Sequence, residues 1–147
     1  MITEVYKNLW NFDPEIYYRV ITTNGNIKSN GEAVMGRGIA LQAAERYPEL
    51  PTLLGNYIKR GGNSVCINSD HKIIMFPTKN KWWEKSNCEL IKKSCKDLFI
   101  LCIQWNIKDI VMPMVGCSNG GLKWDNVKEI IYKELISDFF DVTIARI

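Results

Sequence analysis

Two glycine-rich segments contain residues whose types and spacing could do chemistry. The first is Gly36-Arg37-Gly38, and the second runs from Gly116 to Gly121. Glycines let the backbone approach a ligand closely, and a helix that follows such a loop offers unpaired amides and a partial positive charge. Either segment alone could be no more than a tight turn. Together they favour a phosphate site, and two such loops suit a diphosphate.

Established nucleotide-binding motifs do not describe these loops. The segment that begins at Gly36 lacks the third glycine of the dinucleotide fingerprint, and no carboxylate about 20 residues further on opens a ribose site. The Gly-Lys-Ser/Thr sequence of the P-loop is absent. The sequence therefore disfavours a Rossmann dehydrogenase and a P-loop NTPase.

Lys79 is a candidate reactive group, because it directly follows the apolar run that ends in Phe76-Pro77-Thr78. A lysine that is partly removed from water and close to the charges of Lys81 and Lys85 has a lowered pKa, which makes its amine a better nucleophile. The alternative is a solvated lysine in a basic loop. The residues alone leave both interpretations open.

Two adjacent tryptophans, Trp82 and Trp83, follow this lysine. Because they are neighbours in one short loop, the two side chains cannot both be buried in the core. One of them could stack on a base of the substrate or of a nucleic-acid end, as in proteins that bind single strands. Alternatively, one packs on the edge of the sheet and the other is partly exposed.

The elements that must position these residues follow from hydrophobic periodicity and turn signals. Strands are predicted over 17–22, 64–67, 72–76, 109–113 and 141–147, and helices over 39–47, 50–60, 88–106 and 127–135. This alternation predicts an α/β layer fold with its site at the carboxyl ends of the strands. The apolar final strand is expected inside the sheet or beside the first strand.

Local signals predict details of the helix ends. Ser86-Asn87-Cys88-Glu89 fits a capping box that opens the third helix. Asp125 fits the N-cap of the last helix. Tyr6 and Trp10 are predicted to pack as alternate residues of a strand.

Composition and charge exclude several classes of protein. A length of 147 residues with 46% hydrophobic content fits one globular domain. The net charge of +3 permits an anionic ligand without demanding duplex nucleic acid. No apolar run reaches the roughly 18 residues of a membrane span, and the N-terminus lacks the features of a signal peptide. A cytoplasmic protein without a membrane partner is therefore expected.

The five cysteines indicate neither a zinc site nor a disulfide framework. They form no Cys-x-x-Cys pair, and His71 is the one histidine of the sequence. Three cysteines lie seven residues apart and are expected to line the inner face of the third helix: Cys88, Cys95 and Cys102. No metal site is expected.

Three segments together resemble the macrodomains, a family that binds ADP-ribose. They are Val20 to Gly25, Gly31 to Gln42, and Met112 to Trp124, and they include both glycine loops. Their order and spacing are much more specific than either loop alone. Within the family, the sequence is most similar to the branch of terminal ADP-ribose protein glycohydrolase and of the DNA ADP-ribosyl glycohydrolase antitoxin.

The resemblance implies a three-layer α/β/α fold with a central mixed sheet of about six strands. It implies a single macrodomain over residues 1–147 that acts as a monomer and without a cofactor. The implied partner is ADP-ribose or an ADP-ribosylated substrate, with ADP-ribosylated DNA among the substrates.

The resemblance also implies roles for individual residues. Lys79 matches the catalytic lysine of this branch, which would attack or protonate at the anomeric carbon. Asn24 lies near the position of an asparagine beside the distal ribose. Asn8 and Leu9 fall where the family contacts adenine, with Asn8 in place of an acid. The two phosphate loops correspond to Gly36, Arg37, Gly38 and Ile39, and to Val115, Gly116, Cys117, Ser118, Asn119 and Gly120.

Gly120 departs from the glutamate-directed members, in which an aspartate at this position works with the lysine. The sequence is closer to the DNA-directed members, which favours a hydrolase that releases ADP-ribose from DNA or from protein linked otherwise than through glutamate. Two alternatives stay open. One is a phosphatase acting on ADP-ribose-1''-phosphate, and the other is a non-catalytic reader or sequestering protein for ADP-ribose.

Overall fold

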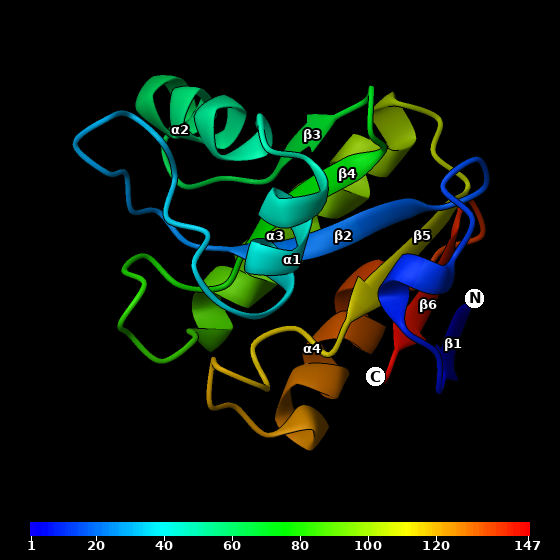
Figure 1. Cartoon of the computed structure of the whole chain (residues 1–147). Helices are drawn as coiled ribbons and strands as arrows, with labels where there is room; N and C mark the ends of the chain where they lie inside the picture. Colours follow the sequence, from blue (N-terminus) through cyan, green and yellow to red (C-terminus); the bar gives the residue numbers. More distant parts are fainter.

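Four helices cover the two faces of one six-stranded sheet in the computed structural model, which describes all residues 1–147 (Figure 1). Every helix and strand predicted between residues 17 and 147 is present, and β1 and the 3₁₀ helix η1 are additional. In chain order the elements are β1 (Ile2–Val5), η1 (Leu9–Asn11), β2 (Tyr18–Thr23), α1 (Gly38–Arg46), α2 (Leu50–Gly61), β3 (Cys66–Asn68), β4 (Ile73–Pro77), α3 (Cys88–Gln104), β5 (Asp109–Pro113), α4 (Trp124–Leu135) and β6 (Asp141–Ala145).

The strand order is β1-β6-β5-β2-β4-β3, and all neighbouring strands are parallel except β3 and β4. The last strand, β6, lies between β5 and the first strand, so Val142 is paired with both Ile110 and Ile2. The final strand is inside the sheet, as expected, but its neighbour is β1 rather than β2, the first strand predicted from the sequence. The sheet is mixed and has six strands, as the resemblance implies.

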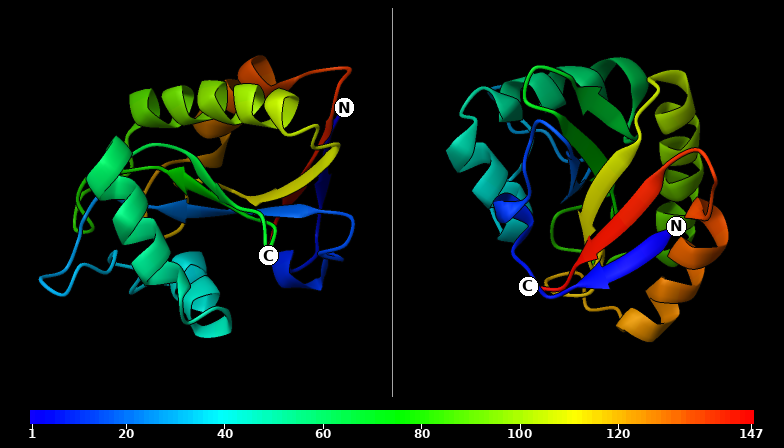
Figure 2. Two further views of the ribbon diagram at one scale, coloured as in Figure 1. Left: turned by 90° about the horizontal axis from the view of Figure 1, so that it is seen from above. Right: turned by 90° about the vertical axis from the view of Figure 1, so that its right-hand side faces the viewer.

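Helices lie on both faces of the sheet (Figure 2). Alternate residues of the strands belong to two large clusters, one on each face. Val20 belongs to the larger cluster, which packs against α3 and α4, whereas Ile21 belongs to the cluster against α1 and α2. The reason is that successive side chains of a strand point to opposite faces. The three-layer α/β/α arrangement is therefore confirmed.

Two of the three cysteines of α3 pack in the core as predicted. Cys95 and Cys102 are buried in the larger core, and burial raises the pKa of both thiols to about 12. Cys88, at the first turn of the helix, is half-buried. Cys95 and Cys102 are therefore core residues rather than reactive groups.

Both predicted helix caps are wrong by one or two residues. Asn87, not Ser86, is the N-cap of α3, because its Oδ1 accepts from the backbone N–H groups of Glu89 and Leu90. The backbone N–H of Ser86 instead donates to the carbonyl of Gly120. Asp125 lies within the first turn of α4 rather than at its cap.

The strand predicted for Tyr6 and Trp10 is absent, although Trp10 packs against two of the hydrophobic clusters, as predicted. Tyr6 follows β1 and is 75% exposed, and Trp10 lies in η1. The side chain of Asn8 accepts from the backbone N–H of Trp10 and so turns the chain into this short helix.

No helix of the structure has the length and apolar character needed to cross a membrane.

Candidate functional site

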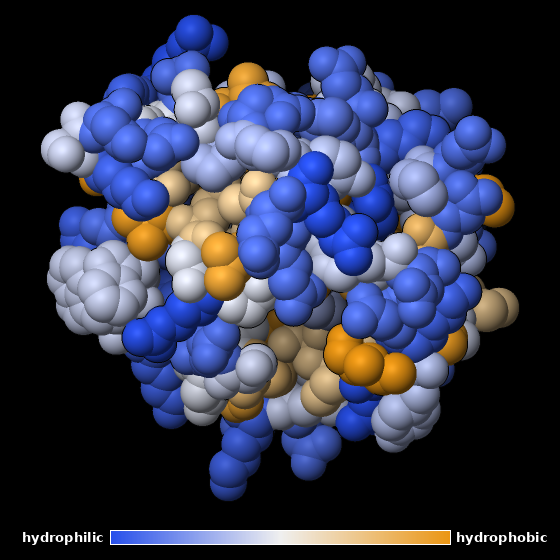
Figure 3. All heavy atoms as spheres, viewed as in Figure 1, coloured by the Kyte–Doolittle hydropathy of each residue, from blue (hydrophilic) through white to orange (hydrophobic).

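A cavity of about 830 Å³ opens where four parallel strands end. Its walls include residues that end or directly follow β2, β4, β5 and β6, which is the position predicted from the α/β alternation. The molecule in Figure 3 is hollowed near the centre of the face, with hydrophilic side chains around much of the hollow.

The first glycine loop brings the N-terminus of α1 to the cavity. Gly36, Arg37, Gly38 and Ile39 all line it. The N-cap residue Arg37 makes no side-chain capping hydrogen bond, so the first amides of α1 have no protein acceptor. Gly38 has φ of +54°, which favours glycine. The loop therefore presents free N–H groups and the positive end of a helix dipole to a ligand.

The second glycine loop presents a further row of free amides. The backbone N–H groups of Ser118, Asn119 and Gly120 donate to no protein acceptor, and all three residues line the cavity. The loop is closed by a hydrogen bond from the N–H of Leu122 to the carbonyl of Gly116, where φ is +75°. Consecutive unpaired amides in such a turn form an anion-binding concavity.

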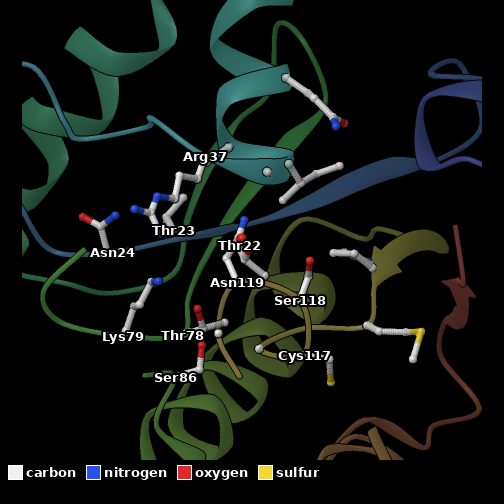
Figure 4. Close-up of a pocket in the computed structure, with 18 of the residues that line it drawn as sticks. Thr22, Thr23, Asn24, Arg37, Thr78, Lys79, Ser86, Cys117, Ser118 and Asn119 are labelled. Carbon is white, nitrogen blue, oxygen red and sulfur yellow. The ribbon is translucent and has the colours of Figure 1, made fainter. Parts of the chain in front are cut away.

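The two loops lie against each other. The Nδ2 atom of Asn119 is 3.0 Å from the position that a Cβ at Gly38 would occupy. Figure 4 shows Asn119 between the start of α1 and Ser118 of the second loop. A diphosphate held here would therefore accept from amides of both loops.

Lys79 enters the cavity from the segment after β4, and it is half-buried. Its Nζ points toward the side of the cavity where Arg37 lies (Figure 4). Partial burial, and secondly the charge of Arg37, lower the pKa of Lys79. The lowered pKa expected from the sequence is therefore present, but the charge responsible is Arg37, and neither Lys81 nor Lys85 contributes.

The lining of the cavity is cationic. Its charged side chains are Arg37, Lys79 and Arg146, and it includes no Asp or Glu. Positive side chains and free amides together favour an anionic ligand. No group of three or more His, Cys, Asp or Glu side chains gathers in the structure to hold a metal ion.

Gly120 has no room for a side chain. A Cβ at this position would lie 2.1 Å from Oγ of Ser86 and 2.4 Å from the carbonyl oxygen of Gly116. Ser86 is 6% exposed, lines the cavity, and its Oγ has no hydrogen-bond partner in the protein. A serine hydroxyl thus fills the space beside the second loop, where it is buried and has no hydrogen-bond partner in the protein.

The other residues proposed from the sequence divide into two groups. Asn8 and Asn24 line the cavity, although Asn24 also donates to the carbonyl of Val34 and accepts from the N–H of Asn26. Gly116 and Cys117 line it with the rest of the second loop. In contrast, the structure does not bring Leu9 or Val115 to the cavity, because both side chains are buried in the core.

Sequence reasoning missed several lining residues. Most of them end or follow a strand of the sheet, so their position at strand ends could have indicated them. They are Thr22, Thr23, Gln42, Thr78, Ser86 and Arg146. Gln42 had no such signal, since it lies on α1 and accepts from Nε1 of Trp10 at 2.8 Å.

A smaller hollow of about 360 Å³ continues from the cavity past Asn8 and Gln42, which line both. Trp10, Glu45 and Arg46 complete it, and the guanidinium of Arg46 lies 4.5 Å from the ring centroid of Trp10. The site is therefore elongated, with an aromatic hollow at one end and Lys79 at the other.

Comparison with known proteins identifies similar chains. The sequence model of a family described as the Macro domain matches residues 28–131. DNA ADP-ribosyl glycohydrolase of Mycobacterium tuberculosis is 35% identical over 109 residues, which are 68% of this chain and 31% of that protein. The chain thus spans about a third of the length of this relative.

A second curated relative is covered over more of its length. ADP-ribose glycohydrolase OARD1 of Bos taurus is 29% identical over 113 residues, which are 77% of this chain and 71% of that protein. Among solved structures, the macrodomain of Thermus aquaticus DarG has a TM-score of 0.83 and 27% identity, with 100% of this chain and 99% of that chain covered.

Proposed function

The chain belongs to the Macro domain family, and we propose that it binds ADP-ribose in the cavity described above and hydrolyses mono-ADP-ribosyl conjugates, above all those of DNA. The observation that carries this proposal is the pairing of two loops of free amides with a lysine of lowered pKa in one cationic cavity. The name of the M. tuberculosis relative supports DNA as the substrate class.

The elongated site suggests how the ligand is oriented. The diphosphate accepts hydrogen bonds from the amides of both glycine loops. The adenine extends toward Asn8 and the aromatic hollow, where the free amide nitrogen of Asn8 can donate to the base. The distal ribose then lies near Lys79 and Asn24. This orientation gives each residue proposed from the sequence, except the buried Leu9 and Val115, a direct place at the ligand.

Lys79 is the proposed catalytic residue. Its lowered pKa increases the fraction of neutral amine, whose lone pair attacks the anomeric carbon of the distal ribose. The glycosidic bond breaks, and its electron pair leaves with the released base, which takes a proton from water. A water molecule then displaces Lys79 from the same carbon and releases ADP-ribose.

The second loop supports a mechanism without a carboxylate partner. No side chain fits at Gly120 while Ser86 occupies the adjacent space, and no Asp or Glu lines the cavity. A mechanism in which a carboxylate of this loop assists the lysine therefore lacks its residue here. This supports DNA conjugates over glutamyl esters as the substrate.

The test is a comparison of product release from defined substrates. We expect release of ADP-ribose from an ADP-ribosylated single-stranded oligonucleotide, and slower release from an ADP-ribosylated glutamate peptide. Phosphate release from ADP-ribose-1''-phosphate without hydrolysis of either conjugate would identify the phosphatase. Binding of ADP-ribose by calorimetry without any turnover would identify a reader. Absence of binding would contradict the whole proposal.

The domain organisation, the oligomeric state and the cellular location of the protein are proposals as well. We propose that residues 1–147 act as one macrodomain, as a monomer and in the cytoplasm. The supporting observations are that β1 and β6, from the two ends of the sequence, pair in one sheet, and that all five cysteines are free. Light scattering of the purified chain tests the monomer directly.

A further inference from the structure

Trp82 and Trp83 are exposed beside the cavity, and the proposed function leaves them without a role. Trp82 is 41% exposed and Trp83 is 64% exposed. Neither packs against any of the three hydrophobic clusters of the protein. Tryptophan is a residue with much apolar surface to bury, so two adjacent exposed rings indicate a surface that meets a ligand.

The loop that carries both rings is held in place from two sides. The backbone N–H of Trp82 donates to Oδ1 of Asn26 at 2.7 Å. The side chain of Asn63 donates to the carbonyl of Lys79 at 3.0 Å and to Oδ1 of Asn80 at 3.1 Å. The rings are therefore presented by an ordered backbone, which reduces the entropy lost when a ligand stacks on them.

The two rings continue the site at the end where Lys79 lies. Trp82 lines the cavity together with Lys79, and the Arg37 guanidinium is 5.5 Å from its ring centroid. The rings of Trp82 and Trp83 are perpendicular, with centroids 5.7 Å apart. The pair therefore lies at the end of the site where the group attached to the distal ribose is proposed to be.

The surrounding charges match a nucleic-acid strand. Lys81 and Lys85 are exposed in the same segment, and Arg37 faces it from the first glycine loop. Flat aromatic faces bind bases by stacking, and the neighbouring cations neutralise phosphates. Cations alone would also attract an acidic peptide, but such a peptide gives the two rings no flat partner.

We propose that Trp82 and Trp83 form a stacking subsite for unpaired bases of the single-stranded nucleic acid from which ADP-ribose is removed. The subsite rests on the proposed function, and it adds a binding site for nucleotides that flank the modified one. Trp82 contacts the modified nucleotide beside Lys79, and Trp83 contacts the next base. Bases within a duplex are stacked on each other, so the subsite selects single strands.

Steady-state kinetics with two conjugates test the subsite. One is an ADP-ribosylated single strand of about 10 nucleotides, within the range of single-strand binding sites. The other is the ADP-ribosylated mononucleotide, which has no flanking base. We expect Trp83→Ala to raise KM for the strand by about 5- to 150-fold, the contribution of stacking one base. KM for the mononucleotide and the Kd of ADP-ribose stay unchanged.

Two variants serve as controls. Trp83→Phe keeps an aromatic face and should restore most of the affinity for the strand. Trp105→Ala removes another tryptophan, which lies at the end of α3, is 50% exposed and belongs to none of the core clusters. This variant should keep the KM of the unchanged protein for both substrates. Equal KM changes for strand and mononucleotide, or none with either, would overturn the subsite. If Trp83→Ala raised KM more for an ADP-ribosylated peptide than for the strand, the rings would bind peptides instead.

Failure of the proposed function is distinguishable from failure of the subsite. If the protein cleaves neither conjugate, the hydrolase proposal fails, and an unmodified oligothymidylate of the same length still tests the subsite through quenching of tryptophan fluorescence. We expect weaker binding of this strand by Trp83→Ala than by the unchanged protein. Equal binding by the two proteins would overturn the subsite.

Discussion

The pKa of Lys79, on which its proposed reactivity depends, is affected by a second cation that lies far away in the sequence. Arg37 belongs to the first glycine loop, yet its charge and the partial burial of Lys79 together lower the pKa of the lysine. When an anionic diphosphate binds between the loops, it lies close to both cations. The free protein and its complex should therefore differ in the charge on Lys79.

Replacement of Arg37 tests this coupling. Because the positive charge of Arg37 lowers the pKa of Lys79, Arg37→Gln raises that pKa and reduces the fraction of neutral amine at a given pH. We expect the rising limb of the pH dependence of kcat/KM, which reports the pKa of the free protein, to move to higher pH.

Arg146→Gln is the matched control for this experiment. Arg146 is the other guanidinium that lines the cavity, but it is not among the causes of the pKa shift of Lys79. The pH profile of activity of Arg146→Gln should have the same midpoint as that of the unchanged protein. The coupling is wrong if Arg37→Gln also keeps that midpoint.

The space beside Gly120 provides a second prediction for a single residue. Gly120→Ala places a Cβ too close to Ser86 Oγ and to the carbonyl oxygen of Gly116. Because these atoms must move apart, we expect the free energy of unfolding to fall by about 1–3 kcal/mol. Gly61→Ala is the matched control, since a Cβ at Gly61 meets nothing within 4 Å. The control should leave stability unchanged or raise it by up to about 1 kcal/mol. Equal urea midpoints for both variants would contradict the close contact at Gly120.

Elements were predicted from the sequence better than their ends. The periodicity of apolar residues fixes α1 to α4 because each helix must bury one face against the sheet. The start of α3 depends instead on which of two neighbouring polar side chains, Ser86 or Asn87, reaches the free amides. The backbone N–H of Ser86 donates to the carbonyl of Gly120, and its Oγ lies beside the second glycine loop instead of bonding the amides of α3. No local pattern reveals that contact.

The cap of α3 is testable by thermal unfolding. Asn87→Ala removes the acceptor of two first-turn amides, which should cost about 1 kcal/mol and lower Tm by about 2–4 °C. Lys96→Ala, on the exposed side of the same helix, should leave Tm nearly unchanged. A larger loss in Ser86→Ala than in Asn87→Ala would restore Ser86 as the cap.

The whole molecule is closed by contacts that no local pattern indicates. Glu4 of β1 accepts from Trp124 and Tyr132 of α4 and from Arg146 after β6, and it forms an ion pair with Lys128 at 2.8 Å. No local pattern predicts the short strand β1. It forms by pairing with β6, which lies at the other end of the sequence. The cavity and Arg146 were predictable from strand ends, whereas the contacts of Glu4 were not.

The Glu4 contacts predict a pH dependence of stability. The hydrogen bond from Lys128, followed by those from Tyr132 and Trp124, keeps the pKa of Glu4 below its usual value of 4.5. A lowered pKa stabilises the fold fully above the unfolded-state pKa, and this stabilisation is lost as pH falls through the folded-state pKa. The advantage of the unchanged protein over Glu4→Gln in urea unfolding should therefore be constant above about pH 5 and shrink below it. A difference independent of pH would contradict the ion pair.

The measurement that tests the central claim most directly is the behaviour of Lys79→Ala toward an ADP-ribosylated single-stranded oligonucleotide. We predict that release of ADP-ribose slows by about 100- to 10,000-fold, while calorimetry finds nearly unchanged affinity for ADP-ribose, because both amide loops remain. Lys108→Ala, exposed at the opposite end of β5, should retain full activity. A Lys79→Ala protein as active as the unchanged protein would contradict the account.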